Sequence, residues 1–267
     1  MHFNNISNWL DYWFIEQRLP EPEQKVFKRY YHSFVFHFGP YLRKHYAAQI
    51  SELEKVIAER PGCRVLEIGC GCGTESIWLG LLGASVTGID LQQDRLNVAW
   101  ARLDHIKATL NLAPDVKFEQ VSVFDATRFG KFDVIWMEQA FHHVEPRDNF
   151  IQLLAQLINP GGVVVISEAN AWNPFLQLQL LLERGFNTVK EYKDKDGNSH
   201  VYGIERITTA GRLSRNLEQA GFTVKSVRYF RIFPNRVWAD RLEWIESITP
   251  TWFKPVFTHY NLVAVKE

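Results

Sequence analysis

The segment 68–74 places glycines at every second position, Gly69, Gly71 and Gly73, directly after a short apolar run. Alternating glycines let the backbone turn tightly and approach a ligand, while the free N–H groups of a following helix face the same space. Asp90 closes the next apolar run, where a carboxylate accepts hydrogen bonds from both hydroxyls of a ribose. These residues predict a site for a nucleoside-containing ligand.

The fifth position after Gly69 separates two classes of nucleoside ligand. A dinucleotide site normally carries a glycine there, for close packing of the helix, and this chain has Thr74. No hydride-transfer motif is visible either. A nicotinamide-dependent oxidoreductase is therefore the less favoured alternative.

A pair of histidines, His142 and His143, follows the apolar run 132–137. Histidine titrates near neutral pH, so a positioned imidazole is suited to take a proton from an acceptor hydroxyl. We predict both as catalytic candidates. The alternative is that one of them packs against, or caps, the helix that begins near Pro146.

Two carboxylates, Glu138 and Glu168, end neighbouring predicted strands and are candidates to orient substrate or cofactor. A metal ion held by the histidines and these carboxylates is a disfavoured alternative. Cys70 and Cys72 form a C-x-C spacing without distant partners, which is more typical of space-filling loop residues than of a zinc site. We therefore predict no metal ion.

Apolar runs alternate with helical patterns along most of the chain, which predicts a doubly wound, mostly parallel α/β sheet covered on both faces. The predicted strands are 64–68, 85–90, 116–121, 132–137, 163–168, 222–230 and 257–265. The predicted helices are 47–59, 74–82, 92–110, 147–157, 174–183, 208–220 and 237–248.

The stretch Glu67-x-Gly69-x-Gly71-x-Gly73, followed by Gly88-Ile89-Asp90, resembles the cofactor signature of class I S-adenosylmethionine-dependent methyltransferases. Asp125, the strand 132–137 and the turn Asn159-Pro160-Gly161-Gly162 match the family in the same order. The resemblance implies a seven-stranded sheet whose last strand is antiparallel and pairs with the sixth.

The resemblance also implies S-adenosylmethionine as cofactor and assigns residues to it. Glu67 and the glycine loop would lie near the methionine moiety, Asp90 would hold the ribose, and Asp125 with neighbouring backbone would hold the adenine. The full set it implies is Glu67, Gly69, Cys70, Gly71, Gly73, Asp90, Leu91, Phe124, Asp125, Ala126 and Glu138.

The implied reaction is a direct displacement at the methyl carbon, to which an enzyme contributes mainly alignment. Nucleic-acid amino methyltransferases of this fold carry an Asn/Asp-Pro-Pro-aromatic motif after the fourth strand, whereas residues 137–140 here are Met-Glu-Gln-Ala. We therefore expect a small, partly apolar acceptor, with transfer to oxygen ahead of transfer to nitrogen. A cofactor-binding protein of the same fold without catalysis is the alternative.

Four segments are predicted along the chain. Residues 1–50 form an aromatic-rich helical cap, and 51–170 form the Rossmann-like cofactor-binding core. Residues 171–207 form an insertion after the fifth strand, with a solvated charged loop over 190–196 and a turn at Asp196-Gly197. Residues 208–267 complete the sheet. The cap and the insertion are expected to form a lid over a small-molecule substrate.

Composition excludes several partner classes. Thirty basic and thirty acidic residues among 267 give a net charge of zero, which removes the general attraction to nucleic acid or an anionic membrane. Cys63, Cys70 and Cys72 are too few and too close for a disulfide framework, and no signal peptide or membrane-spanning run is apparent. We expect a cytoplasmic protein with no nucleic-acid or membrane partner; the oligomeric state is left open.

Overall fold

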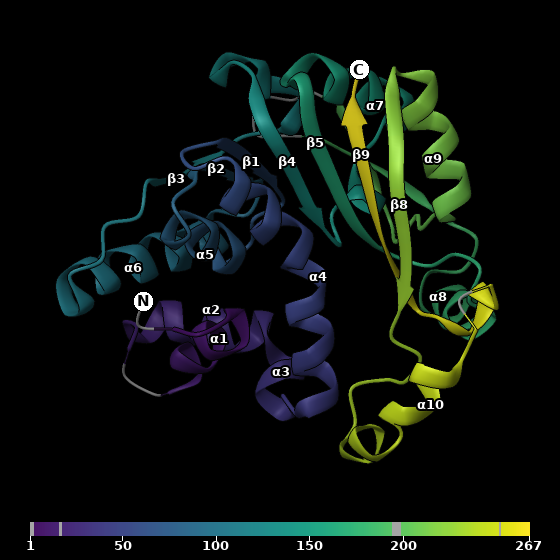
Figure 1. The fold of residues 1–267 in the computed structure, drawn as a ribbon, viewed down its shortest axis with the longest axis horizontal. Coiled ribbons are helices and arrows are strands. Elements are labelled where there is room, and N and C mark those ends of the chain that lie inside the picture. Colours follow the sequence, from purple (N-terminus) through teal and green to yellow (C-terminus); the bar gives the residue numbers. More distant parts are fainter. Residues whose placement is uncertain (1–2, 16–17, 194–198, 251) are drawn as a thin grey trace.

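The computed structural model describes residues 3–15, 18–193, 199–250 and 252–267, and its centre is a seven-stranded sheet (Figure 1). In their order across the sheet, the strands are β3 (Val116–Gln120), β2 (Ser85–Asp90), β1 (Arg64–Ile68), β4 (Phe132–Glu138), β5 (Ile158–Ala169), β9 (His259–Lys266) and β8 (Phe222–Phe230). Two further strands, β6 (Val189–Lys193) and β7 (Ser199–Gly203), pair only with each other.

Strands β1 to β5 pair in parallel, whereas β9 runs antiparallel to both β5 and β8. The predicted seven-stranded sheet with an antiparallel last strand is thereby confirmed. The chain builds outward from β1 in one direction through β2 and β3, and in the other through β4 and β5. Ligands of open α/β sheets bind at such a reversal, outside the carboxyl ends of the strands.

Successive residues of the central strands enter two different cores. Val65 and Trp136 pack in the core on one face of the sheet, while Leu66 and Ile135 pack in the core on the other. Because both faces are covered, these strands are apolar almost without interruption, as parallel strands usually are. That continuity is why the sequence predicted them well.

Helices cover both faces of the sheet. One face carries α4 (Pro40–Glu59), α5 (Thr74–Leu81) and α6 (Gln93–Leu110), and the other carries α7 (Arg147–Leu157) and α9 (Ala210–Gln219). Helix α4 begins well before the predicted residue 47, with Pro40 in its first turn, where proline is favoured. The predicted cap boundary at residue 50 therefore falls inside one continuous helix.

The remaining amino-terminal helices, α1 (Ile6–Phe14), α2 (Glu21–Tyr30) and α3 (His32–Phe36), pack beside the glycine segment. Arg102, from α6, is fully buried and lies against the rings of Trp13 and Phe27 from this cap. Its guanidinium also donates to Thr74 Oγ1 at 2.6 Å. One buried cation thus joins the cap to the first residue of α5.

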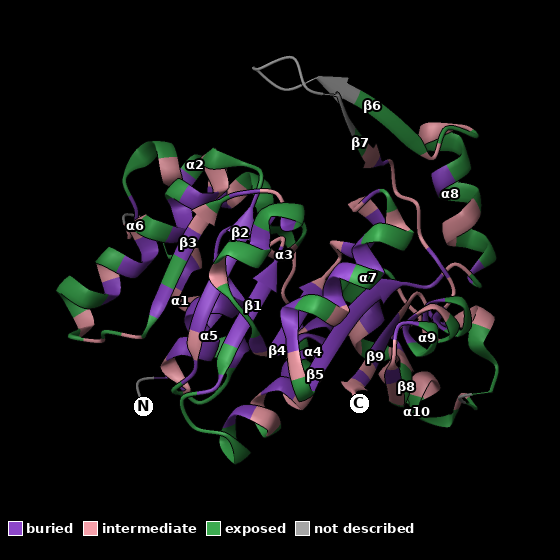
Figure 2. Ribbon diagram, turned by 90° about the horizontal axis from the view of Figure 1, so that it is seen from above, coloured by how far each residue is buried: buried purple, intermediate pink, exposed green. Residues whose placement is uncertain are grey.

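The insertion after β5 contains α8 (Pro174–Arg184) and the β6–β7 pair. The prediction of a solvated loop over 190–196 was wrong for 190–193, which belong to β6; the predicted Asp196-Gly197 turn lies outside the described residues. Pairing between β6 and β7 satisfies their backbone polar groups and does not require an apolar, buried face. The polar side chains of this segment therefore gave no sign of a strand. Figure 2 shows exposed residues of β6 leading away from the main sheet.

The predicted single helix over 237–248 is two elements, a 3₁₀ helix η3 (Val237–Arg241) and α10 (Glu243–Ile248), followed by the 3₁₀ helix η4 (Lys254–Val256). A contact with the cap accompanies the break. The Asp240 carboxylate accepts from the backbone N–H of Tyr41 at 3.1 Å and lies 2.9 Å from His37 Nε2. Within the described part of the chain, every helix is too short or too polar to span a bilayer.

Candidate active site

The loop between β1 and α5 has the backbone that its glycines predict. Gly69, Gly71 and Gly73 have φ angles of +77°, +51° and +72°, in the left-handed region that glycine adopts most readily. A Cβ on Gly71 would lie 2.3 Å from the Tyr30 hydroxyl, and one on Gly73 would lie 2.6 Å from the Phe118 ring. Both conformation and close packing therefore require glycine here.

Asp90 ends β2 beside this loop and is almost buried, with 8% of its surface exposed. Its carboxylate accepts from the backbone N–H of Gly71 at 2.9 Å and from that of Gln92 at 2.8 Å. An ionised carboxylate offers about four acceptor positions. Two backbone donors therefore fix the carboxylate and leave acceptor capacity for a ligand.

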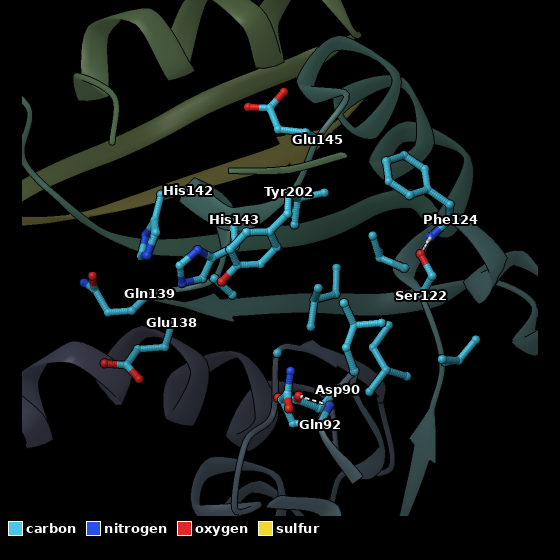
Figure 3. Close-up of a pocket in the computed structure, with 18 of the residues that line it drawn as sticks. Asp90, Gln92, Ser122, Phe124, Glu138, Gln139, His142, His143, Glu145 and Tyr202 are labelled. Atoms are coloured by element: carbon cyan, nitrogen blue, oxygen red, sulfur yellow. Dashed lines mark hydrogen bonds between the residues drawn. The ribbon is translucent and has the colours of Figure 1, made fainter. Parts of the chain in front are cut away.

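A cavity of about 680 Å³ opens at the carboxyl ends of β1, β2 and β4. Figure 3 shows Phe124 and Ser122 on one side of it, the histidines and Tyr202 on another, and Asp90 with Gln92 beneath. The predicted site residues that line it are Gly69, Asp90, Leu91, Phe124, Glu138, His142 and His143. Those that do not are Glu67, Cys70, Gly71, Gly73, Asp125 and Ala126.

The residues outside the cavity wall fall into two groups. Cys70, Gly71 and Gly73 belong to the glycine loop, and Glu67 lies on β1 just before it, is 2% exposed and accepts a hydrogen bond from the Ser76 hydroxyl. Asp125 is exposed on the 3₁₀ helix η1 (Val123–Phe129), on which Ala126 is buried. The predicted cofactor contacts of both groups stay predictions.

His142 lies on the 3₁₀ helix η2 (Phe141–His143), directly after β4, and is 4% exposed. Its Nδ1 lies 2.8 Å from Oε2 of Glu168, at the end of β5, and its Nε2 lies 3.4 Å from Oε2 of Glu205. Burial lowers the pKa of His142, but the charge and hydrogen bond of Glu168, with the charge of Glu205, outweigh burial and raise it overall.

His143 has a different environment. Its side chain is 31% exposed, its Nδ1 lies 2.9 Å from the carbonyl oxygen of Gly203, and its ring stacks on Tyr202 at 4.7 Å. Burial and the neighbouring charge of His142 lower the pKa of His143. The pKa values of the two histidines are thus shifted in opposite directions, upward for His142 and downward for His143. Of the two, His142 is the one with a carboxylate at its Nδ1.

Three carboxylates, Glu67, Glu75 and Glu138, lie close enough to affect one another at the inner end of the site. Burial, reinforced by the negative charge of Glu75, raises the pKa of Glu138 to about 8, although Gln49 donates to it at 3.0 Å. Burial also raises the pKa values of Glu67 and Glu75. This arrangement favours a cationic group in the cavity, because a nearby positive charge would favour the ionised carboxylates.

Several lining residues were not predicted from the sequence: Tyr30, Gln92, Arg95, Ser122, Tyr202 and Glu205. Gln92 and Ser122 lie within two positions of predicted site residues and just after predicted strands, so the sequence could have identified them as site residues. The others come from the cap, from α6 and from the insertion; the Arg95 guanidinium, for example, lies 5.1 Å from the centre of the Tyr30 ring. No local pattern marks those contacts.

Comparison with known proteins assigns the family. Residues 38–227 match the model of the family described as "Methyltransferase domain". The chain is 29% identical over 185 residues to a ubiquinone biosynthesis O-methyltransferase of Chelativorans sp. (strain BNC1), a match that covers 69% of this chain and 68% of that protein. It is 34% identical over 110 residues to the Xanthomonas campestris pv. campestris (strain B100) protein of the same name, covering 41% and 44%.

Among solved structures, the fold is similar to magnesium protoporphyrin IX methyltransferase from Synechocystis PCC 6803, crystallised with bound SAH. The TM-score is 0.58 at 16% identity, covering 92% of this chain and 96% of that one, which is a likeness of fold. The family match spans the glycine loop, Asp90 and the histidine pair. The chain therefore belongs to the methyltransferase-domain family and is a class I S-adenosylmethionine-dependent methyltransferase.

Proposed function

We propose that the protein transfers the methyl group of S-adenosylmethionine to an oxygen of a small, partly apolar acceptor beside His142 and His143. The observation that carries this proposal is that Gly69, Asp90 and both histidines line one cavity. A cavity of about 680 Å³ is within the range of small-molecule and cofactor sites. Cofactor and acceptor would therefore meet in a single cavity.

The names of the relatives support oxygen as the accepting atom. The curated proteins compared above are called ubiquinone biosynthesis O-methyltransferases, although the matches cover only 68% and 44% of their lengths. The apolar part of the cavity wall, which includes Val144 and Val201, supports an acceptor that is itself partly apolar. No feature of the cavity calls for a nucleic acid.

We assign the cofactor to the side of the cavity nearest β2. Asp90 would accept from the ribose hydroxyls, since two backbone donors leave it further lone pairs. Leu91 and Phe124 are 47% and 36% exposed and line the cavity, and the adenine would lie against them. Glu138 and the carboxylates behind the glycine loop would favour the cationic methionine end.

The reaction itself requires little from the protein besides alignment. The acceptor oxygen attacks the methyl carbon, the carbon–sulfur bond breaks, and S-adenosylhomocysteine leaves with the electron pair on sulfur. The acceptor's O–H proton would pass to Nε2 of His142, because Nδ1 already donates to Glu168. Residues of the cap and the insertion line the cavity, and we expect them to limit the access of water that would compete for the methyl group.

The first test is ligand selectivity. We expect isothermal titration calorimetry to show one S-adenosylhomocysteine bound per chain and no heat with NAD, because Thr74 fills the position where a dinucleotide site needs glycine. Methyl-labelled S-adenosylmethionine should then label a panel of phenols in preference to amines. Binding of NAD without S-adenosylhomocysteine would overturn the assignment, and binding without any label transfer would support the non-catalytic alternative.

The second test concerns the ribose contact. Asp90→Ala should weaken S-adenosylhomocysteine binding by about 1–3 kcal/mol, because buried hydroxyl and backbone donors lose their acceptor. Asp90→Asn, which keeps one carbonyl acceptor, should give a smaller loss by calorimetry. Asp94→Ala is the matched control, since Asp94 is a nearby, partly exposed carboxylate paired with Arg29. Unchanged affinity in Asp90→Ala would contradict the ribose assignment.

A further inference from the structure

Three side chains that meet at the cavity wall form a set of metal-ligand type: His142, His143 and Glu205. One ligand atom from each lies within 4.8 Å of the others. Nε2 of His142 is 3.4 Å from Oε2 of Glu205, and Nε2 of His143 is 3.8 Å from its Oε1. Two ligands about 2.1 Å from a tetrahedral ion are about 3.4 Å apart, so each histidine lies near that distance from one of the two Glu205 oxygens, and small side-chain rotations would bring the three donors around one ion.

The opposite edge of each imidazole is already occupied by an acceptor. Nδ1 of His142 lies 2.8 Å from the Glu168 carboxylate, and Nδ1 of His143 lies 2.9 Å from the Gly203 carbonyl oxygen. A carbonyl oxygen only accepts, so the Nδ1 of His143 carries its hydrogen and the lone pair of the neutral ring is on Nε2. Histidines that bind metals nearly always donate their second N–H to a carboxylate or a carbonyl in this way.

The backbone around Glu205 holds its carboxylate against the histidines. Glu205 has a φ of +46°, a left-handed conformation that a non-glycine residue adopts at a cost and that concentrates at ligand sites. Two residues earlier, a Cβ on Gly203 would lie 2.2 Å from the His142 carbonyl oxygen, so only glycine permits this approach. A β-bridge between Val144 and Tyr202 fixes the same contact.

We infer that Nε2 of His142, Nε2 of His143 and the Glu205 carboxylate bind one divalent transition-metal ion, with Zn²⁺ as the natural candidate. Two histidines and one carboxylate with an open position are a recurrent catalytic donor set for such ions. The sequence prediction of no metal ion considered Glu138 and Glu168 as the carboxylates, and neither supplies the third ligand. Glu205 does, from the insertion.

The inference rests on the proposed function and deepens it. All three residues line the cavity, so an ion held by them would be within reach of an acceptor hydroxyl; it would favour loss of the hydroxyl proton to solvent and leave the oxygen anion to attack the methyl carbon. Histidine lone pairs bound to the ion no longer accept that proton, so the metal-loaded protein would activate the oxygen through the ion.

The test uses the tag-free, chelator-treated full-length chain. Calorimetry should show one Zn²⁺ bound per chain, and Co²⁺ should give visible d–d absorption of a low-coordinate site that Zn²⁺ abolishes. Glu205→Gln and His143→Ala should each weaken Zn²⁺ binding by at least tenfold. Glu191→Gln, in the same insertion, and His32→Ala are matched controls with exposed side chains and should bind as wild type does.

Equal Zn²⁺ affinity in wild type and Glu205→Gln would overturn the inference, as would the absence of stoichiometric Zn²⁺ binding. Glu205→Gln is nearly isosteric at a partly exposed position, so it decides the matter even if His143→Ala fails to fold. S-adenosylhomocysteine binding is measured on the same samples. If the wild-type protein binds S-adenosylhomocysteine but not Zn²⁺, the metal site alone is refuted. If it binds neither S-adenosylhomocysteine nor Zn²⁺, the proposed function is refuted as well.

Discussion

His142→Ala is expected to lower turnover by about 10²–10⁴-fold in the chelator-treated protein, the range that a positioned base contributes. His142 is almost buried, faces the cavity through Nε2, and is held through Nδ1 by Glu168 at 2.8 Å. Removing the ring takes away the proton acceptor without touching Asp90 or the glycine loop. Labelled-methyl transfer should therefore fall while S-adenosylhomocysteine affinity stays near that of wild type.

Two further variants distinguish the base from a packing role. Glu168→Gln keeps a hydrogen-bond acceptor for Nδ1 but removes the charge, so we expect an intermediate loss of turnover. His143→Ala should cost less in the chelator-treated protein, because no carboxylate supports His143 at Nδ1. If His142→Ala and wild type transfer methyl groups at the same rate, alignment alone suffices and His142 is a packing residue.

The sequence predicted the central strands and the first ligand loop because the physical causes there are local. An apolar run buried on both faces, glycines that take positive φ angles, and a carboxylate at a strand end all leave their marks within a few residues of Gly69 and Asp90. The lengths of β1 and α7 were predicted without error for the same reason.

The rest of the site depends on contacts between distant segments. Tyr30 reaches the cavity from the cap, and Glu205 reaches it from an insertion whose strands carry polar residues. Neither belongs to a periodic pattern, because their positions are set by how α2 and the β6–β7 pair pack against the core. The early start of α4 was not predicted for the same reason. Tyr41 and His45 form hydrogen bonds with Glu246 in the carboxyl-terminal segment, so the first turns of α4 do not show the apolar spacing of a helix that packs on one core.

That contact between α4 and the carboxyl-terminal segment carries the second large effect. Glu246, on α10, accepts from the Tyr41 hydroxyl at 2.7 Å, from His45 Nε2 at 3.1 Å and from the backbone N–H of Arg231 at 3.0 Å. Burial raises its pKa, but these hydrogen bonds and the charge of His45 outweigh burial and lower the pKa of Glu246 from 4.5 to about 2. The Glu246 side chain is 14% exposed, so solvent screens its interactions with these partners only slightly.

A carboxyl group whose pKa is lower in the folded than in the unfolded state stabilises the fold at pH values above the unfolded-state pKa. That stabilisation is lost as the pH falls toward and below the folded-state pKa. Glu246→Gln, which resembles the protonated group, should therefore lower the free energy of unfolding by about 3 kcal/mol near neutral pH. Urea unfolding should show this difference above about pH 4.5 and its progressive loss toward pH 2. Glu243→Gln, which removes a more exposed partner of Lys44, should change stability by less than about 1 kcal/mol. A Glu246→Gln protein as stable as wild type at neutral pH would mean that α10 does not secure the cap.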